Sequence, residues 1–308
     1  MLRTTMLAMA RNEQARAAVT AFRPTRAVVK RFVPGETEDD CLLAVAELAR
    51  RKLSSTIDYL GEDTTNQAQA IATANAYVSR IERLQREGLA DMAEVSVKLS
   101  AVGQFLPQGR TLALENATRI CAAAAEAGTT VTVDMEDHTR TSSTLELLAE
   151  LRAEYPTTGA VLQAYLKRTP DDCRALATAG SRVRLCKGAY DEPSSVAHQT
   201  KADVDKAFVD CLRILMEGDG FPMIATHDPT MISTALSFAN ATGRSIDSYE
   251  LQMLYGIRPD EQQRLADLGH RVRVYVPFGT DWYGYFMRRL AERPANLIFF
   301  LRAVAGRR

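Results

Sequence analysis

The chain has 308 residues, a formal net charge of zero at pH 7 and a hydrophobic fraction of 46%. These values are typical of a globular protein with a sizeable core, and the balanced charge gives no general indication of a nucleic-acid partner. Five cysteines without a C-x-x-C spacing argue against a disulfide framework or a zinc ribbon, and no apolar run is long enough to predict a transmembrane helix. We therefore expect a reduced, cytoplasmic protein that holds no metal.

Residues 1–52 precede the first predicted strand and have a mainly helical pattern, so we expect an N-terminal helical arm. Its first 31 residues contain seven basic side chains and one acidic side chain. Such an arm could be a segment that binds anionic lipid, an arginine-rich transit peptide or an ordinary solvated helix. We favour the solvated helix and keep peripheral contact with the inner face of the cell membrane as an alternative.

Eight short segments rich in β-branched residues recur along the rest of the chain, with amphipathic helical stretches between them. Continuous apolar strands that alternate with helices predict a parallel sheet buried on both faces. Eight such units in about 250 residues favour a (β/α)8 barrel, with an open doubly wound sheet as the alternative. We expect a single catalytic domain over residues 1–308, with the barrel at 53–308. The predicted strands are 54–60, 94–100, 130–136, 160–166, 182–188, 222–227, 249–255 and 271–277.

Polar side chains gather at the carboxyl ends of these predicted strands, which is the end of a (β/α)8 barrel where the chemistry lies. A barrel also needs polar strand ends to meet solvent, so each of these residues has a purely structural explanation too. Five cations would surround one mouth, and together they predict a site for anionic groups. These cations are Lys98, Arg184, Lys187, Arg288 and Arg289.

The helix expected after the eighth strand carries Tyr285, Arg288 and Arg289 at positions i, i+3 and i+4, which share one helix face. Arginine can hold both oxygens of a carboxylate, so a phenol beside two guanidiniums predicts a pocket for a small carboxylate with an apolar body. The alternative is a plain surface ion pair with Glu292, and the spacing alone favours that alternative.

Nine short motifs at the strand ends and on the last helix resemble the proline dehydrogenase family, in the family's order, from about residue 31 to residue 296. Each motif is short, and the specificity comes from the set. They are LGE (60–62), SVKLS (96–100), VDMED (133–137), VLQAY (161–165), RLCKGAY (184–190), ATHD (225–228), QMLYG (252–256), YVPFG (275–279) and YGYFMRRLAERPAN (283–296).

The resemblance implies a distorted (β/α)8 barrel whose final helix lies over the barrel mouth. It also implies bound FAD and the oxidation of L-proline to Δ1-pyrroline-5-carboxylate, the first step of proline catabolism to glutamate, with electrons passed to a membrane quinone. The chain has no room for a fused aldehyde dehydrogenase module, so we expect pyrroline-5-carboxylate dehydrogenase to be a separate partner. The resemblance further implies that Tyr275 favours proline over hydroxyproline as the substrate.

The resemblance also implies roles for individual residues. The implied catalytic residues are Asp134, Arg184 and Tyr275. The implied substrate contacts are Lys98, Arg288 and Arg289 for the carboxylate, Tyr285 for the ring, and Tyr190 and Leu254 for the apolar wall. The implied FAD contacts are Met135, Gln163, Arg184, Lys187, Gly188, Ala189, Thr226, His227, Gln252 and Glu292.

Two other functions stay open. A Schiff-base aldolase on the same barrel would use Lys98 or Lys187 as its nucleophile, would contain no flavin and would be trapped by borohydride with a keto substrate. A non-catalytic anion-binding module would bind carboxylates or phosphates and would show no turnover with any dye acceptor.

Overall fold

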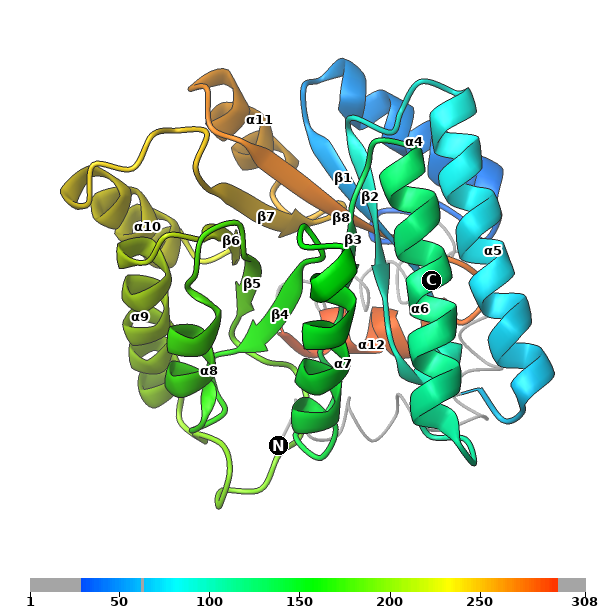
Figure 1. Ribbon diagram of the computed structural model, residues 1–308. Helices are drawn as coiled ribbons and strands as arrows, with labels where there is room; N and C mark the ends of the chain where they lie inside the picture. Colours follow the sequence, from blue (N-terminus) through cyan, green and yellow to red (C-terminus); the bar gives the residue numbers. More distant parts are fainter. Residues whose placement is uncertain (1–28, 62–63, 293–308) are drawn as a thin grey trace, which may run out of the picture.

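A computed structural model describes residues 29–61 and 64–292, except for the side chains of Arg288, Leu290, Ala291 and Glu292. Most of the predicted arm therefore lies outside the described residues. Within them, eight parallel strands form one sheet in the order β3-β2-β1-β8-β7-β6-β5-β4, and helices cover its outer face (Figure 1). The predicted (β/α)8 barrel is confirmed.

All eight predicted strands are present, and most end earlier than their sequence patterns indicated. The strands are β1 (Ser54–Tyr59), β2 (Ala93–Val97), β3 (Val131–Val133), β4 (Ala160–Gln163), β5 (Arg182–Cys186), β6 (Phe221–Ala225), β7 (Glu250–Leu254) and β8 (Val272–Phe278). The helices are α4 (Glu38–Arg50), α5 (Gln67–Arg86), η1 (Ser100–Val102), α6 (Gly109–Glu126), α7 (Thr141–Glu154), α8 (Thr169–Leu176), α9 (Lys201–Glu217), α10 (Pro229–Ala241), α11 (Pro259–Asp267) and α12 (Trp282–Glu292).

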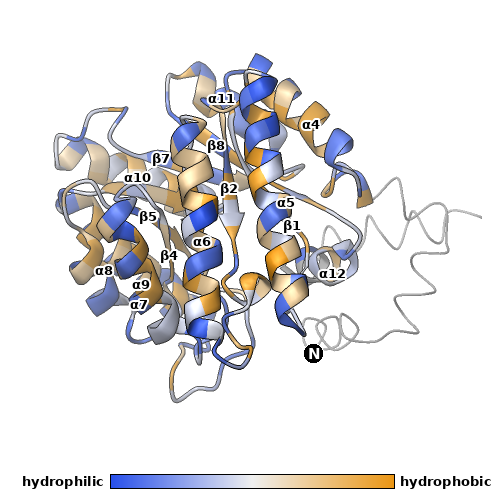
Figure 2. Cartoon of the chain, turned by 45° about the vertical axis from the view of Figure 1, so that its right-hand side comes forward, coloured by the Kyte–Doolittle hydropathy of each residue, from blue (hydrophilic) through white to orange (hydrophobic). Residues whose placement is uncertain are grey.

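The outer helices are amphipathic and bury one face against the sheet, so hydrophobic and hydrophilic residues lie on the same helix (Figure 2). In α9, for example, Phe208, Leu212 and Leu215 recur every three or four residues and are all buried. Among residues 29–61 and 64–292, no helix has both the length and the apolar character that crossing a bilayer requires.

Successive side chains along each strand point alternately outward to the helix layer and inward to the barrel interior. This differs from the continuous apolar pattern that we expected. Ile57, Val95 and Val276 are in register and fully buried in the cluster that includes the helix side chains. Their neighbours along each strand face the other way, into the barrel. That interior holds polar and charged side chains, among them Glu94 and Arg184.

The barrel closes between β3 and β4 at Gly159, the residue before β4. The Gly159 amide donates to the Val131 carbonyl at 2.8 Å, and the Val133 amide donates to the Gly159 carbonyl at 2.9 Å. A Cβ atom at this position would lie 2.5 Å from Thr132 Oγ1. A glycine is therefore what allows the two edge strands to approach closely enough to pair.

Helix α12 lies at the carboxyl ends of the strands (Figure 1) and is held by the segment that precedes α4. The Phe286 ring centre is 6.1 Å from the Phe32 ring centre, and Trp282 Nε1 donates to Glu36 at 2.8 Å. The position of α12 thus depends on residues near the start of the described chain.

We expect Gly159→Ala to destabilise the fold by about 1–3 kcal/mol, because the added methyl group must displace Thr132 at the barrel seam. Urea unfolding followed by circular dichroism measures this loss. The matched control is Gly61→Ala, where an added Cβ would meet its nearest atom, in the Tyr59 ring, at 3.8 Å. An unfolding midpoint for Gly159→Ala equal to that of the parent protein would contradict the close approach at the seam.

Candidate active site

Asp134 follows β3 directly and is held from two sides at the carboxyl end of the barrel. Arg184 Nη1 of β5 donates to Asp134 Oδ1 at 2.9 Å, and the Tyr275 hydroxyl of β8 donates to Asp134 Oδ2 at 2.7 Å. The guanidinium carbon of Arg184 lies 5.3 Å from the centre of the Tyr275 ring. The structure therefore brings together the three residues predicted to be catalytic, each from a different strand.

Tyr275 acts in this cluster as a hydrogen-bond donor. Burial and the negative charge of Asp134 raise the pKa of the Tyr275 phenol well above its usual value. The phenol therefore stays protonated at neutral pH. It can orient Asp134 and cover a ligand, and it cannot serve as a base.

Lys98 follows β2 and is already paired with a carboxylate. Its Nζ lies 3.0 and 3.2 Å from the two carboxylate oxygens of Asp58, which is only 2% exposed. Burial alone would lower the pKa of Lys98, but the Asp58 and Asp134 carboxylates outweigh that effect and raise it above its usual value. Lys98 therefore stays charged, which suits a contact with an anion and opposes nucleophilic attack by a free amine.

Lys187 also has carboxylate partners, namely Asp205 of α9 and Asp228, which caps α10. The sequence predicted five cations around one mouth and hence a site for anionic groups. In the structure, carboxylates offset the charges of Lys98, Arg184 and Lys187. The excess positive charge is smaller than the residue types alone indicated.

The two predicted glutamine contacts come from different strands, and Gln252 contacts the cluster directly. Gln252 of β7 accepts from Arg184 Nε at 2.6 Å through its Oε1. Gln163, the last residue of β4, donates from Nε2 to the carbonyl of Glu136 at 2.7 Å. Because the amide nitrogen of Gln163 is engaged there, its Oε1 is the atom that can accept a hydrogen bond from a ligand.

Thr226 and His227 follow β6 and organise the loop at its end. Thr226 Oγ1 accepts from the Asp228 amide at 3.1 Å, and His227 Nε2 accepts from the Leu254 amide at 2.8 Å. The unprotonated Nε2 places the proton of a neutral His227 on Nδ1. Both side chains thus position backbone at the mouth.

The loop after β5 carries Gly188 and Ala189, and it turns sharply over Tyr165. Gly188 has φ +106°, and a Cβ there would lie 2.2 Å from the Tyr165 ring. Tyr190 packs against the same small cluster as Tyr165. Met135, next to Asp134 in the loop after β3, is buried as well. A side chain at Gly188 would push this loop away from the barrel.

Helix α12 contributes an apolar wall and a cation to the mouth. Tyr285 is buried in one cluster with Leu254 of β7, and the guanidinium carbon of Arg289 lies 5.1 Å from the Tyr285 ring centre. Burial raises the pKa of Cys186, at the end of β5, to about 11, and the backbone hydrogen bond of Gly188 and the charges of Arg184 and Arg289 oppose that rise. The side chains of Arg288 and Glu292 lie outside the described residues, so their predicted roles are still predictions.

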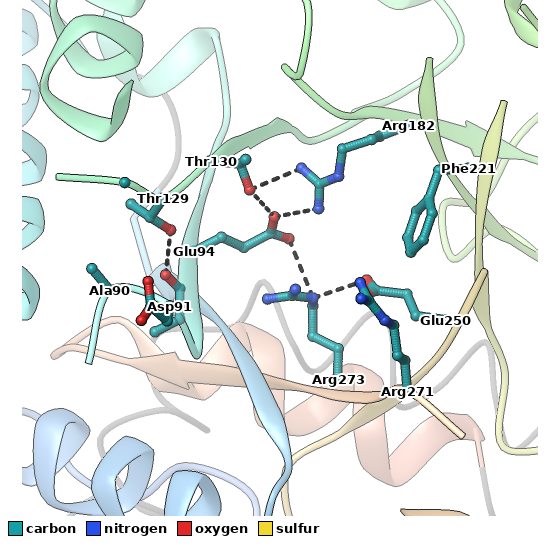
Figure 3. A pocket seen from close by; sticks show the side chains of 12 residues that line it. Ala90, Asp91, Glu94, Thr129, Thr130, Arg182, Phe221, Glu250, Arg271 and Arg273 are labelled. Atoms are coloured by element: carbon teal, nitrogen blue, oxygen red, sulfur yellow. Dashed lines mark hydrogen bonds and ion pairs between the residues drawn. The ribbon is translucent and has the colours of Figure 1, made fainter. Parts of the chain in front are cut away.

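A charged network fills the barrel interior below this mouth, and the sequence analysis missed it. Glu94 accepts from Arg182 Nη2 at 2.7 Å, and Glu250 accepts from Arg273 Nε at 2.8 Å. These four side chains line a cavity of about 340 Å³ at the amino ends of the strands (Figure 3). The available signal was the placement of polar residues two apart, as in Glu94-Val-Ser-Val-Lys98, which puts them on one strand face.

A model of the proline dehydrogenase family matches residues 41–302. The chain belongs to the proline dehydrogenase family. The proline dehydrogenase of Deinococcus radiodurans is 41% identical over 282 residues, which are 90% of each chain. Proline dehydrogenase 1 of Bacillus subtilis strain 168 is 36% identical over 304 residues, which are 99% of each chain. The predicted family is therefore confirmed over nearly the whole chain.

Solved structures of proline utilization A have the same barrel. The protein from Bdellovibrio bacteriovorus, inactivated by N-propargylglycine, matches with a TM-score of 0.80 and 25% identity over 86% of this chain and 32% of its own. A mutant of the Bradyrhizobium japonicum protein matches with a TM-score of 0.74 and 27% identity over 95% of this chain. The chain spans about a third of these larger proteins, so the agreement concerns that part.

We expect Lys98→Met to destabilise the fold by about 3–5 kcal/mol, because Asp58 would be left buried without its partner. Burial already raises the pKa of Asp58, and loss of Lys98 would raise it further. A carboxyl group whose pKa is raised in the folded state weakens folding above its unfolded pKa of about 4, and this penalty disappears below it.

The loss should therefore be larger near pH 7 than near pH 4, as measured by urea unfolding at both values. The double variant Asp58→Asn/Lys98→Met should regain part of the stability, because no buried charge is left. A loss that is the same at both pH values would show that Asp58 does not depend on Lys98.

Proposed function

We propose that this protein oxidises L-proline to Δ1-pyrroline-5-carboxylate with bound FAD and passes the electrons to a quinone. The observation that carries the proposal is the cluster of Asp134, Arg184 and Tyr275 at the carboxyl ends of the strands. It lies beneath an apolar wall and a cation of α12, in a chain whose family is named for this activity.

The hydrogen-bonding groups at the mouth fit a flavin ring, which carries one N–H donor between carbonyl acceptors. Gln163 Oε1 can accept from that N–H, and the guanidinium of Arg184 supplies positive charge at the ring edge. Bound FAD supplies the two-electron acceptor, and nearby positive charge favours its reduced form. We assign the remaining cofactor contacts to Met135, Lys187, Gly188, Ala189, Thr226, His227, Gln252 and Glu292.

We assign the proline carboxylate to Arg288 and Arg289, with Lys98 as a further cation. Tyr275, Tyr285, Tyr190 and Leu254 would surround the ring and exclude water. Holding the carboxylate at two points and the ring against a phenol fixes which ring carbon faces the acceptor, and positioning of this kind can supply several kcal/mol of the barrier. The substrate amine must be neutral when hydride leaves the neighbouring carbon, and no strong base is needed at that carbon.

The ion pairs of the two lysines favour this reaction over the aldolase alternative. A Schiff-base lysine must lose its proton to attack a carbonyl group. Asp58 and Asp134 raise the pKa of Lys98, and two carboxylates surround Lys187. Lys98 is thus arranged to keep its charge, and Lys187 is engaged in ion pairs with Asp205 and Asp228.

The quinone acceptor, a separate pyrroline-5-carboxylate dehydrogenase and a single catalytic domain over residues 1–308 are further parts of this proposal. The basic segment, which we favour as a solvated helix with contact at the inner face of the cell membrane as the alternative, falls mostly within residues 1–28, outside the described residues.

The visible spectrum of the purified protein tests the cofactor and the substrate together. We expect flavin absorbance that bleaches when L-proline is added without oxygen and returns when a soluble quinone is added. A flavin spectrum that ignores proline would move the substrate elsewhere. A colourless protein that FAD cannot reconstitute would overturn the proposal.

Arg289→Gln tests the assignment of the carboxylate site. Loss of one charged contact to the carboxylate should weaken proline binding by about 2–5 kcal/mol, seen as a raised KM with a dye acceptor, while the flavin stays bound. The control is Arg271→Gln at the opposite end of the barrel, where the arginine side chain is 54% exposed. An unchanged KM for Arg289→Gln would remove this arginine from the site.

A further inference from the structure

The guanidinium of Arg184 is held by the barrel at each of its nitrogens. The side chain is 5% exposed, so its donors depend on protein acceptors. Nε donates to Gln252, Nη1 donates to both Asp134 and Ser96, and Nη2 lies at 3.4 Å from both Thr56 Oγ1 and Glu94 Oε1. The orientation of Arg184 toward Asp134 is thus set by residues on several strands.

The acceptor on Gln252 is itself fixed by Glu250. Gln252 Nε2 donates to Glu250 Oε1 at 2.5 Å, and the same oxygen accepts from Arg273 Nε at 2.8 Å. This arrangement keeps the carbonyl oxygen of Gln252 turned toward Arg184. In the flipped orientation the Gln252 amide would present its own donors to Arg184 Nε, and both groups would lack an acceptor.

Glu94 supports Arg184 from the other side. Its Oε1 accepts from Thr56 and Thr132 as well as from Arg184, and its Oε2 accepts from Arg182 and Thr130. Burial would raise the pKa of Glu94, but Arg182, Arg273 and Arg184 outweigh it and hold the pKa far below its usual value. Glu94 is therefore a permanent negative charge next to Arg184.

We propose that Glu250, acting through Gln252, and Glu94 are positioning residues that orient the Arg184 guanidinium for the reaction. This inference rests on the proposed function, in which Arg184 lies at the edge of the flavin. Both carboxylates line the cavity at the amino ends of the strands (Figure 3). Asp134 directly follows β3, and Tyr275 pairs with Leu254, the last residue of β7. A change at one end of the barrel is thus transmitted to the chemistry at the other.

The test compares Glu250→Leu with Glu250→Gln in the FAD-loaded protein. Glu250→Leu removes the acceptor of Gln252 Nε2, so the Gln252 carbonyl oxygen is no longer held toward Arg184 Nε and one of the contacts that orient the guanidinium is weakened. We expect kcat to fall by about tenfold or more, with a smaller change in the proline KM. We also expect a more negative flavin reduction potential, because the positive charge is less well aligned with the reduced ring. Glu250→Gln keeps one amide oxygen as an acceptor and should recover most of both quantities.

Asp91→Leu is the matched control, because Asp91 is an acidic residue that lines the same cavity without contacting Gln252 or Arg184. Thermal unfolding establishes that each variant is folded. If Glu250→Leu does not fold, Glu250→Ala replaces it, since water from the cavity can then solvate Gln252. Such water both donates and accepts, so it does not fix the orientation of the amide.

A flavin potential and a kcat for Glu250→Leu equal to those of the parent protein would overturn the inference. It would equally be overturned if Asp91→Leu lowered both quantities as much as Glu250→Leu does. The proposed function is tested separately by the parent protein: if its flavin is not reduced by proline, the function itself fails. If the parent flavin is reduced and the Glu250 variants match the parent, only the positioning role fails.

Discussion

Charge balance inside the barrel is the constraint on which the rest of the structure depends. Arg182, Arg184 and Arg273 place three guanidiniums in an interior where an unpaired charge costs several kcal/mol. Glu94, Glu250 and Asp134 balance them, and these residues come from β2, β5, β7, β8 and the position directly after β3. A slip of one residue in any of these strands would turn a charged side chain outward into the apolar layer beneath the helices. The ion network therefore specifies the strand register. A purely apolar interior would specify it less strictly.

The same network prepares the site at the carboxyl ends. Because Arg184 is fixed before any ligand arrives, its charge and the Asp134 carboxylate that it holds require little reorganisation on binding. Groups that are held in place in a site shielded from water stabilise developing charge better than mobile ones. Lys98 is fixed in the same way, because both carboxylate oxygens of Asp58 accept hydrogen bonds from its Nζ.

Much of this arrangement could be predicted from sequence, because local patterns encode local structure. The β-branched segments predicted every strand, and amphipathic spacing predicted helices such as α9. The motifs at the strand ends predicted the family and, through it, Asp134, Arg184 and Tyr275 as the catalytic residues. The pairing of Lys98 with Asp58, or of Glu94 with Arg182, could not be predicted, because the partners lie 40 and 88 positions apart in the chain and meet only through the register of the barrel strands. The alternation of polar residues along β2 and β5 did indicate an inward polar face. Which arginine meets which carboxylate follows only from three-dimensional closure.

The order of the sheet has a consequence for the chain as it leaves the ribosome. β1 pairs with β8 along its length, and α12 packs against Phe32, near the start of the described residues. These contacts join the earliest and latest parts of the barrel, so they have the longest sequence separation and the highest entropic cost of closure. During synthesis β1 must wait, with one edge unpaired, until β8 has emerged. An exposed strand edge is a surface to which other chains can add, so this interval is when the nascent protein most needs the protection of a chaperone.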